Sequence, residues 1–164
     1  MAEKLDIYNC NRIKNGKIIE RKKEMQLNDD EYILAVQCWI INDNGEILLT
    51  QRRLDKSNGG MWEPTGGLAQ SGENSMQAVK RELQEEIGLK VADNEIKLVK
   101  ERKDEDNSFR DIYVINKNID VKDLNFTDGE VIDAKYATAD ELCNMIQEGK
   151  SFKWLTPFIN DYIL

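Results

Sequence analysis

Hydrophobic residues recur at steps of three and four in one stretch of the chain: Met76, Val79, Leu83 and Ile87. This spacing predicts an amphipathic helix over residues 74–87 that packs these side chains against a core. Asn74 and Gln77 fit a reciprocal cap at the start of this helix. Gly88 fits the left-handed residue that commonly follows the end of a helix.

Other hydrophobic segments predict strands. The segment Tyr32–Asn42 is almost continuously apolar, which is typical of a central strand covered on both faces. Asn44-Gly45 then predicts a tight turn into a second strand at Glu46–Arg53. Near the N-terminus, Arg12–Ile19 predicts a hairpin with Asn15-Gly16 in its turn. Further extended segments are predicted at residues 62–68, 95–102, 109–116 and 130–137.

The C-terminal region predicts two helices. Thr138 and Glu141 fit a capping box that opens a helix ending at Gly149. Thr156-Pro157 fits the start of a last short helix. No repeat, low-complexity tract or linker interrupts the pattern, so we expect one α/β domain over residues 1–164. Within it we distinguish an N-terminal hairpin or arm (residues 1–30) and C-terminal helices (residues 138–164).

Three glutamates of the predicted central helix share one face, because Glu82, Glu85 and Glu86 are spaced at i, i+3 and i+4. Like charges at this spacing destabilise a helix by about 0.2–0.5 kcal/mol per pair. An acid-rich solvated face is the ordinary explanation, and on these three residues alone it would be preferred. The alternative is a site that binds a cation.

The chain contains no histidine. This absence excludes Ser-His-Asp catalysis, Cys-His nucleophiles and imidazole metal sites. Proton transfer must therefore fall to carboxylates, lysines, tyrosines or metal-bound water. The three cysteines, Cys10, Cys38 and Cys143, are widely spaced, and we expect reduced thiols rather than a disulfide or a metal site.

The charge of the chain restricts its partners. A net charge of −8 argues against non-specific binding to nucleic acid, which needs a basic surface. Residues 1–27 nevertheless carry seven Lys or Arg against four acidic residues, so this arm is either a solvated face or the border of a site for an anionic ligand. No apolar run approaches the roughly 18 residues of a membrane span, and the N-terminus lacks an apolar signal core, so we expect a cytoplasmic protein.

The stretch 67–89 matches a longer motif: Gly67, Glu73, Arg81, Glu82, Leu83, Glu85, Glu86, Gly88 and Leu89. Leu83 and Leu89 need only be aliphatic, and the other seven residues are fixed in type. Seven fixed residues at about one in fifteen each give a chance match of ~10⁻⁸ per window. The protein therefore resembles a MutT-like Nudix hydrolase, and residues 67–89 are its Nudix box. The resemblance implies the Nudix fold, an α/β/α sandwich with a mixed β-sheet.

The resemblance also implies a metal site. Glu82, Glu85 and Glu86 would be metal ligands, together with the backbone carbonyl of Gly66. Mg²⁺ prefers such oxygen ligands, and Mn²⁺ is an expected substitute. In this family, metal ions activate water and clamp a diphosphate.

The general base is less determined by the resemblance. In some relatives it is a box glutamate, for which Glu82 and Glu85 are the candidates. In others it is an acid outside the box, for which Glu130 is preferred and Asp128 and Glu105 are alternatives. A solvated strand-end carboxylate is an equally good interpretation of Glu130 by itself.

Other motif residues are expected to support the site. Gly67, Glu73, Arg81 and Gly88 are assigned structural roles, with Arg81 orienting Glu73 through charge-assisted hydrogen bonds. Arg52 and Arg53 end a strand that points towards the box. Because side chains alternate along a strand, only one of the two is expected to face the site and bind a phosphate of the substrate. Trp62 is expected to belong to the core rather than to stack on a base.

The resulting hypothesis is Mg²⁺-dependent hydrolysis of a phosphoanhydride bond in a nucleoside di- or triphosphate derivative, foremost a nucleoside triphosphate or an oxidised nucleotide. One alternative is a Nudix-fold binding or sensor module without turnover. Another is an enzyme similar to isopentenyl diphosphate isomerase, but its catalytic cysteine and histidine ligands have no counterpart in the loop Pro64–Gly67 or elsewhere. Many relatives dimerise, so a homodimer remains open.

Overall fold

The computed structural model describes residues 1–164 in full. The strands are β1 (Lys4–Tyr8), β2 (Lys14–Glu20), β3 (Ile33–Ile41), β4 (Ile47–Arg52), β5 (Trp62–Glu63), β6 (Gly66–Leu68), β7 (Lys97–Asp104), β8 (Ser108–Asn116) and β9 (Val131–Ala137). The helices are α1 (Ser75–Ile87), α2 (Ala139–Gln147) and α3 (Thr156–Phe158), and α3 continues into a π-helical turn at Ile159–Ile163.

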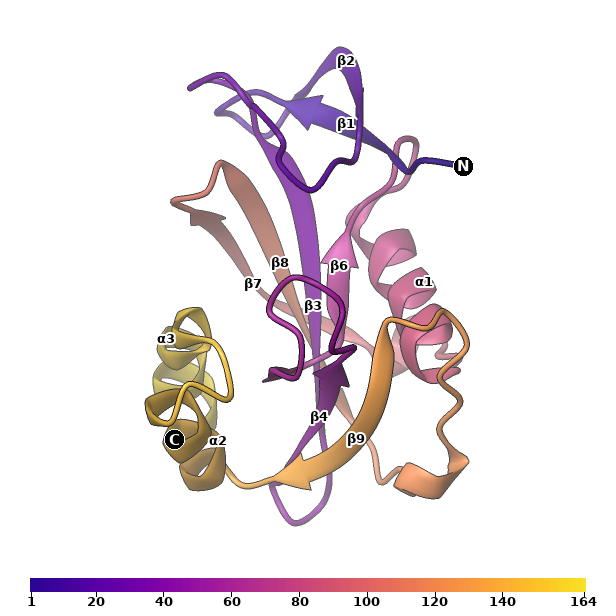
Figure 1. Ribbon diagram of the computed structural model, residues 1–164, viewed down its shortest axis with the longest axis vertical. Helices are drawn as coiled ribbons and strands as arrows, with labels where there is room; N and C mark the ends of the chain where they lie inside the picture. Colours follow the sequence, from indigo (N-terminus) through magenta and orange to yellow (C-terminus); the bar gives the residue numbers. More distant parts are fainter.

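The main sheet is mixed and lies between two helical layers. Its order is β5-β4-β3-β8-β7, with β6 paired to β3 and β9 paired to β4. The β3–β8 pairing is parallel, from Ile33 opposite Ser108 to Ile41 opposite Asn116, and the other pairings are antiparallel. Helix α1 covers one face, and α2 and α3 cover the other (Figure 1). The predicted α/β/α sandwich is confirmed.

Strand β3 changes partner along its length. One end pairs with β6 through residues 35–37, whereas its contact with β4 is the single pair Ile41–Ile47. From this pair onward β4 leaves β3 and carries β9 and β5 with it (Figure 1). The sheet therefore splits beside β3, and the split opens next to α1.

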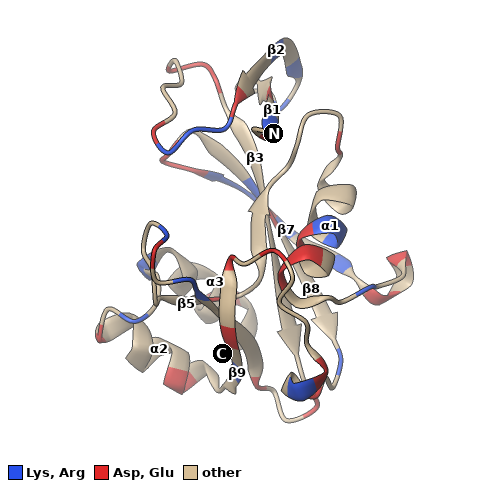
Figure 2. Ribbon diagram, turned by 45° about the vertical axis from the view of Figure 1, so that its right-hand side comes forward, with Lys and Arg blue, Asp and Glu red and all other residues tan.

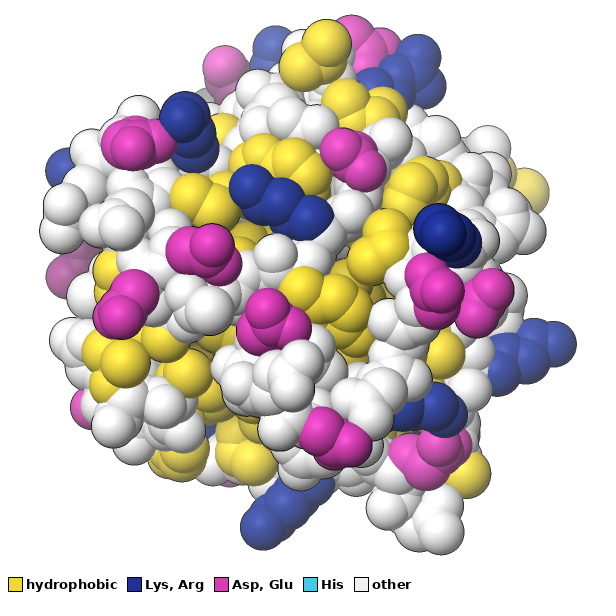
Figure 3. Space-filling view, turned by 90° about the horizontal axis from the view of Figure 1, so that it is seen from below, with side chains coloured by type: hydrophobic (Ala, Val, Ile, Leu, Met, Phe, Trp, Pro, Cys, Tyr) yellow, Lys and Arg dark blue, Asp and Glu magenta, His cyan; other side chains and the backbone are white.

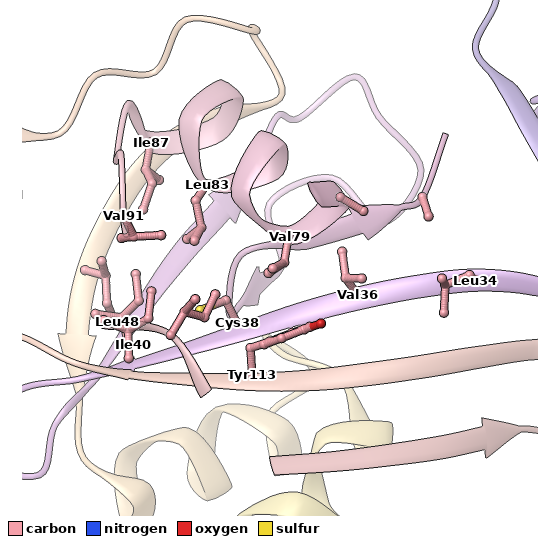
Figure 4. Packing of buried hydrophobic residues seen from close by; sticks show 14 of the residues in the cluster. Leu34, Val36, Cys38, Ile40, Leu48, Val79, Leu83, Ile87, Val91 and Tyr113 are labelled. Atoms are coloured by element: carbon pink, nitrogen blue, oxygen red, sulfur yellow. The ribbon is translucent and has the colours of Figure 1, made fainter. Parts of the chain in front are cut away.

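The side chains on the two faces of β3 pack into two separate hydrophobic cores, because alternate side chains of a strand point in opposite directions. Figure 4 shows α1 side chains pointing onto one face: Val79, Leu83 and Ile87 against Val36, Cys38 and Ile40. On the other face, Trp39 packs with Phe158 of α3 at a ring-centroid distance of 4.7 Å. This burial on both faces explains why β3 is so continuously apolar.

The predicted ends of α1 are confirmed. The Asn74 side chain accepts the backbone N–H of Gln77 at 2.9 Å, and the Gln77 side chain accepts the N–H of Asn74 at 2.9 Å. Gly88 ends the helix in the left-handed region, with φ of 70°. Thr138 and Glu141 form the same reciprocal cap on α2.

The prediction that Asn15-Gly16 forms the first hairpin turn is wrong. Strands β1 and β2 pair with each other, and the turn between them lies at residues 9–13. There Asn9 Oδ1 accepts two backbone N–H groups, and Arg12 takes a left-handed φ of 64°. Gly16, with φ of 87°, lies inside β2 where the register with β1 shifts. Glycine adopts this positive φ easily, which allows a β-bulge at this position. The Asn9 side chain supplies the competing turn.

The end of the molecule opposite the N-terminal hairpin has a mixed surface. Hydrophobic side chains there alternate with both basic and acidic ones (Figure 3). None of the helices is both long and apolar enough to span a membrane.

Candidate active site

The split in the sheet forms a cleft of about 380 Å³. Residues 35–37 of β3 line it, together with side chains from other parts of the chain: Glu3, Arg21, Arg52, Glu63, Glu82, Glu85, Glu86, Arg110, Asp128, Glu130 and Trp154. Acidic positions on α1 and around the start of β9 are red in Figure 2. The cleft thus gathers both acidic and basic groups from distant parts of the chain.

Arg81 is the centre of a network beside the cleft. Its Nε and Nη2 donate to the two carboxylate oxygens of Glu73 at 2.7 and 3.1 Å, which is the contact expected from the sequence. Nη2 also donates to the Leu68 carbonyl at 2.9 Å, and Nη1 donates to Glu82 and Glu85, both at 2.9 Å. One guanidinium therefore ties the loop before α1 to three carboxylates.

Glu82 is buried against the glycine loop. A Cβ on Gly67 would lie 2.3 Å from Glu82 Oε1, so only glycine leaves room for this carboxylate. Burial raises the pKa of Glu82 to about 7, although Arg81 acts in the opposite direction. The environment therefore penalises the charged form of Glu82.

Glu86 is the most constrained acid of the site. It is buried, and its Oε2 has no hydrogen-bond partner. Burial raises the pKa of Glu86 well above its usual value, and the negative charges of Glu82 and Glu63 raise it further. A buried carboxylate oxygen without a donor costs about 1–3 kcal/mol, so this atom needs an explanation.

The three helix carboxylates do not form a preformed metal centre. No group of three or more acidic or cysteine side chains lies close enough to hold a metal ion. Arg81 Nη1 instead lies between one oxygen of Glu82 and one oxygen of Glu85. Glu85 is also the most exposed member, with 44% of its side chain accessible.

Of the two adjacent arginines, Arg52 lines the cleft and Arg53 does not. Arg52 Nη1 donates to Glu63 Oε1 at 2.8 Å. Burial raises the pKa of Glu63, and Arg52 offsets part of that shift. Arg53 instead pairs with Asp55 at 2.8 Å and donates to the Gly129 carbonyl at 3.3 Å.

The comparisons with known proteins agree with this arrangement. A family model described as the NUDIX domain matches residues 31–160. The chain belongs to the Nudix hydrolase family. It is thus an enzyme of the class that acts on acid anhydrides in phosphorus-containing compounds.

Individual relatives support the same assignment. A Listeria monocytogenes protein named as an uncharacterized Nudix hydrolase is 33% identical over 142 residues, covering 85% of this chain and 82% of the relative. A CTP pyrophosphohydrolase from Escherichia coli is 39% identical over 59 residues, covering 36% of this chain and 44% of the relative. A solved structure from Deinococcus radiodurans has a TM-score of 0.81 at 21% identity and covers 96% of this chain and 98% of its own, which shows the shared fold.

Outside the Nudix box, the structure separates the candidate bases. Glu130 and Asp128 line the cleft, whereas Glu105 lies in a neighbouring hollow. Glu130 accepts from Lys56 Nζ at 3.0 Å. Burial raises the pKa of Asp128, and the charges of Glu130 and Glu85 add to the increase.

Two further expectations concern residues near the Nudix box. Gly66 lines the cleft from β6, where a Cβ would lie 2.4 Å from the Val36 carbonyl oxygen. Trp62 does not line the cleft. It packs against the core under α2 and α3, as expected from the sequence.

Several cleft residues were missed by the sequence analysis: Glu3, Arg21, Gln37, Glu63, Arg110 and Trp154. Each lies outside the Nudix box and reaches the cleft through long-range pairing or through the N-terminal hairpin. Among these residues, only Arg21 had a signal in the sequence, because the basic composition of residues 1–27 was compatible with a site for an anionic ligand.

Proposed function

We propose that this Nudix hydrolase uses a divalent cation, foremost Mg²⁺, to hydrolyse a phosphoanhydride bond in a nucleoside di- or triphosphate derivative. The leading substrate class is a nucleoside triphosphate, including oxidised nucleotides. The buried Glu86 Oε2 without a hydrogen-bond partner, beside Glu82 and Glu85, carries this proposal. The name of the E. coli relative, a CTP pyrophosphohydrolase, supports the nucleoside triphosphate class.

The residues of the cleft fit a hard divalent cation. The donors are carboxylate oxygens of Glu82, Glu85 and Glu86 with the carbonyl of Gly66, the ligand type that Mg²⁺ prefers. The lone Oε2 of Glu86 would gain a partner, and the mutual repulsion of the glutamates would be relieved. A divalent ion bound there would neutralise charge on the phosphates and make an attacking water more acidic.

The remaining groups are assigned by their chemistry. Arg52 is a donor for a phosphate oxygen, because it lines the cleft and its Nη2 remains available while Nε donates to the Ser57 carbonyl and Nη1 to Glu63. Arg53 is assigned a supporting role in the Gly129 turn. The general base is one of three carboxylates, Glu82, Glu85 or Glu130, each of which lines the cleft.

A binding module without turnover remains the second candidate. The observation that favours it is the network of Arg81, which already supplies a positive charge to one oxygen each of Glu82 and Glu85. Hydrolysis requires a divalent cation to bind these glutamates as well. The two functions therefore differ in whether Mg²⁺ binds beside Arg81.

The test is turnover by the purified full chain on a panel of nucleoside triphosphates, oxidised nucleotides, sugar nucleotides and dinucleotides. We expect release of phosphate or pyrophosphate that needs Mg²⁺ or Mn²⁺ and stops with excess chelator. Glu86→Gln should lower kcat by about 100-fold or more, since loss of a metal ligand costs several kcal/mol.

Glu101→Gln is the matched control, because Glu101 is 60% exposed and does not line the cleft. It should retain wild-type turnover. Full activity in chelator would contradict the metal-dependent proposal. Tight nucleotide binding with no turnover across the panel would establish the binding module instead.

A further inference from the structure

The cleft continues into a hollow on each side. A cleft of about 380 Å³ is at the small end of the roughly 300–1,000 Å³ typical of ligand sites. One neighbouring hollow, of about 580 Å³, shares Arg21, Arg52 and Glu130 with it. The other, of about 490 Å³, shares Arg110 and Trp154. The three hollows form one groove that suits a ligand longer than the cleft.

The end of the groove at the N-terminal hairpin is basic. Arg21 is anchored there, because its backbone N–H donates to the Glu3 carbonyl at 2.7 Å and its Nη1 donates to the Glu3 carboxylate at 2.6 Å. Lys22 and Lys23 follow directly, are exposed and make no ion pair. Lys56 lines the same hollow. Two uncompensated cations therefore lie at this end of a protein whose net charge is −8.

The opposite end is built around an aromatic ring. The Arg110 guanidinium lies 4.4 Å from the centroid of the Trp154 ring. Arg110 Nε also donates to Asp104 Oδ2 at 2.7 Å, and Arg102 pairs with the same carboxylate. Because the acidic residues 104–106 line this hollow, its arginine charges are compensated. This end offers stacking surface rather than a free positive charge.

The floor between the two ends presents a polar group from β3. Trp39 Nε1 donates to Gln37 Oε1 at 3.0 Å, which orients the amide of this buried residue. The amide nitrogen of Gln37 makes no hydrogen bond within the protein, and Gln37 lines the cleft. A fixed donor in the same cleft as the Trp154 ring suits the polar edge of a planar heterocycle.

Resting on the proposed function, we propose that the substrate lies along this groove in one direction. Its nucleobase packs against the Trp154–Arg110 pair, and its terminal phosphates lie against Lys22 and Lys23. Stacking on aromatic and guanidinium planes is worth about 1–3 kcal/mol per base, and it needs no net charge. Phosphates are attracted to the uncompensated lysines and repelled by residues 104–106. The carboxylates of α1 then lie beside the middle of the polyphosphate chain.

The experiment separates the two ends with two variants of the full chain. In Lys22→Glu/Lys23→Glu, binding of inorganic tripolyphosphate, measured by calorimetry with Mg²⁺ at low salt, should weaken at least about fivefold. KM for nucleoside triphosphates should rise, and the effect should shrink at high salt. The relative kcat/KM values among different bases should not change.

Trp154→Leu should give the reverse result. Tripolyphosphate binding should stay at the wild-type value, whereas KM for nucleotides rises at least about fivefold and discrimination among bases weakens. Lys90→Glu/Lys122→Glu is the control for net charge, because both lysines are exposed and make no ion pair. It should leave every readout unchanged. Circular dichroism should show that all three variants are folded.

The outcomes distinguish this orientation from the function itself. Suppose that turnover is observed, but Trp154→Leu weakens tripolyphosphate binding and the lysine variant alters base discrimination. This result overturns the orientation and leaves the hydrolase proposal intact. Unchanged behaviour of either variant also overturns it. Absence of all turnover would refute the proposed function, and nucleotide binding by the same variants would then decide the orientation.

Discussion

Two arginine–carboxylate clusters border the same groove with different charge balance. In the first, the single guanidinium of Arg81 serves Glu73, Glu82 and Glu85, and Glu86 beside them has no cation at all. In the second, Arg102 and Arg110 share one carboxylate, Asp104. The first cluster has more acids than cations, whereas in the second two guanidinium groups pair with one carboxylate and the neighbouring Glu105 and Asp106 compensate the remaining charge.

The first cluster can therefore bind a further cation, whereas the carboxylate of the second already has its ion-pair partners. The Arg81 cluster is partly buried, and the buried Glu86 beside it has an oxygen without a partner, which costs free energy unless another cation binds. The Asp104 cluster satisfies its carboxylate twice and still leaves guanidinium surface for packing on Trp154. The comparison therefore assigns chemistry to the first cluster and substrate contact to the second.

The largest expected effect is on folding stability. Arg81→Ala should lower the free energy of unfolding by about 3–5 kcal/mol, because it leaves several partly buried carboxylates without a cation. Arg110→Ala should cost only about 1–2 kcal/mol, because Asp104 keeps Arg102. Urea denaturation of both variants measures the difference. Equal losses would show that the two clusters do not differ in charge balance as described.

The next effect concerns metal binding. Mg²⁺ at 100 times its Kd should stabilise the wild-type protein by about 2.7 kcal/mol and raise Tm accordingly. Glu86→Gln should lose most of this increase, yet without metal it should be at least as stable as wild type, since it replaces a buried carboxyl group whose charged form is disfavoured by burial. Glu101→Gln should behave as wild type. An equal Mg²⁺ shift in Glu86→Gln would place the ion elsewhere.

The smallest effect is a dependence on acid pH at the second cluster. Burial raises the pKa of Asp104, but the ion pairs with Arg102 and Arg110 outweigh it and hold the pKa below its ordinary value. Its folded pKa is thus lower than its unfolded value, so the stabilisation is present above the unfolded pKa and is lost as pH falls through the folded one.

Asp104→Asn should therefore cost about 1–2 kcal/mol at pH 7. The difference from wild type should shrink as the pH falls below about 4. Thermal unfolding of both proteins from pH 7 to pH 3 measures it. A difference that stays constant over this range would exclude an ionic contribution from Asp104.

The elements that could be predicted are those whose signals are local. The cap of α1 at Asn74, its end at Gly88 and the apolar run of β3 each depend on a few neighbouring residues, and each was predicted. The first hairpin failed because two local turn signals competed. The chain turns at Asn9, whose side chain caps the turn, and not at Asn15-Gly16. The position of the turn depends on the pairing of β2 with β1, which the dipeptide does not reveal.

The candidate site was predictable only where the motif is contiguous. The spacing of the Nudix box placed Glu82, Glu85 and Glu86 on one face of the helix, but the burial of Glu82 and Glu86 and the contact of Glu82 with Gly67 are seen only in the structure. The opposite wall comes from residues far away in the chain, such as Arg110 and Trp154. These reach the cleft through the parallel pairing of β8 and the turn after α2, for which no local pattern exists.

The partner change of β3 also bears on how the chain folds. Its contact with β4 closes over a short turn, whereas its parallel pairing joins Ile33 to Ser108, which is distant in the sequence. Folding slows as such non-local pairings increase, because a long loop must be ordered before they stabilise anything. The groove needs both pairings and α1 in place. The carboxylates of α1 therefore come together with Arg110 and Trp154 only when the long-range topology is formed.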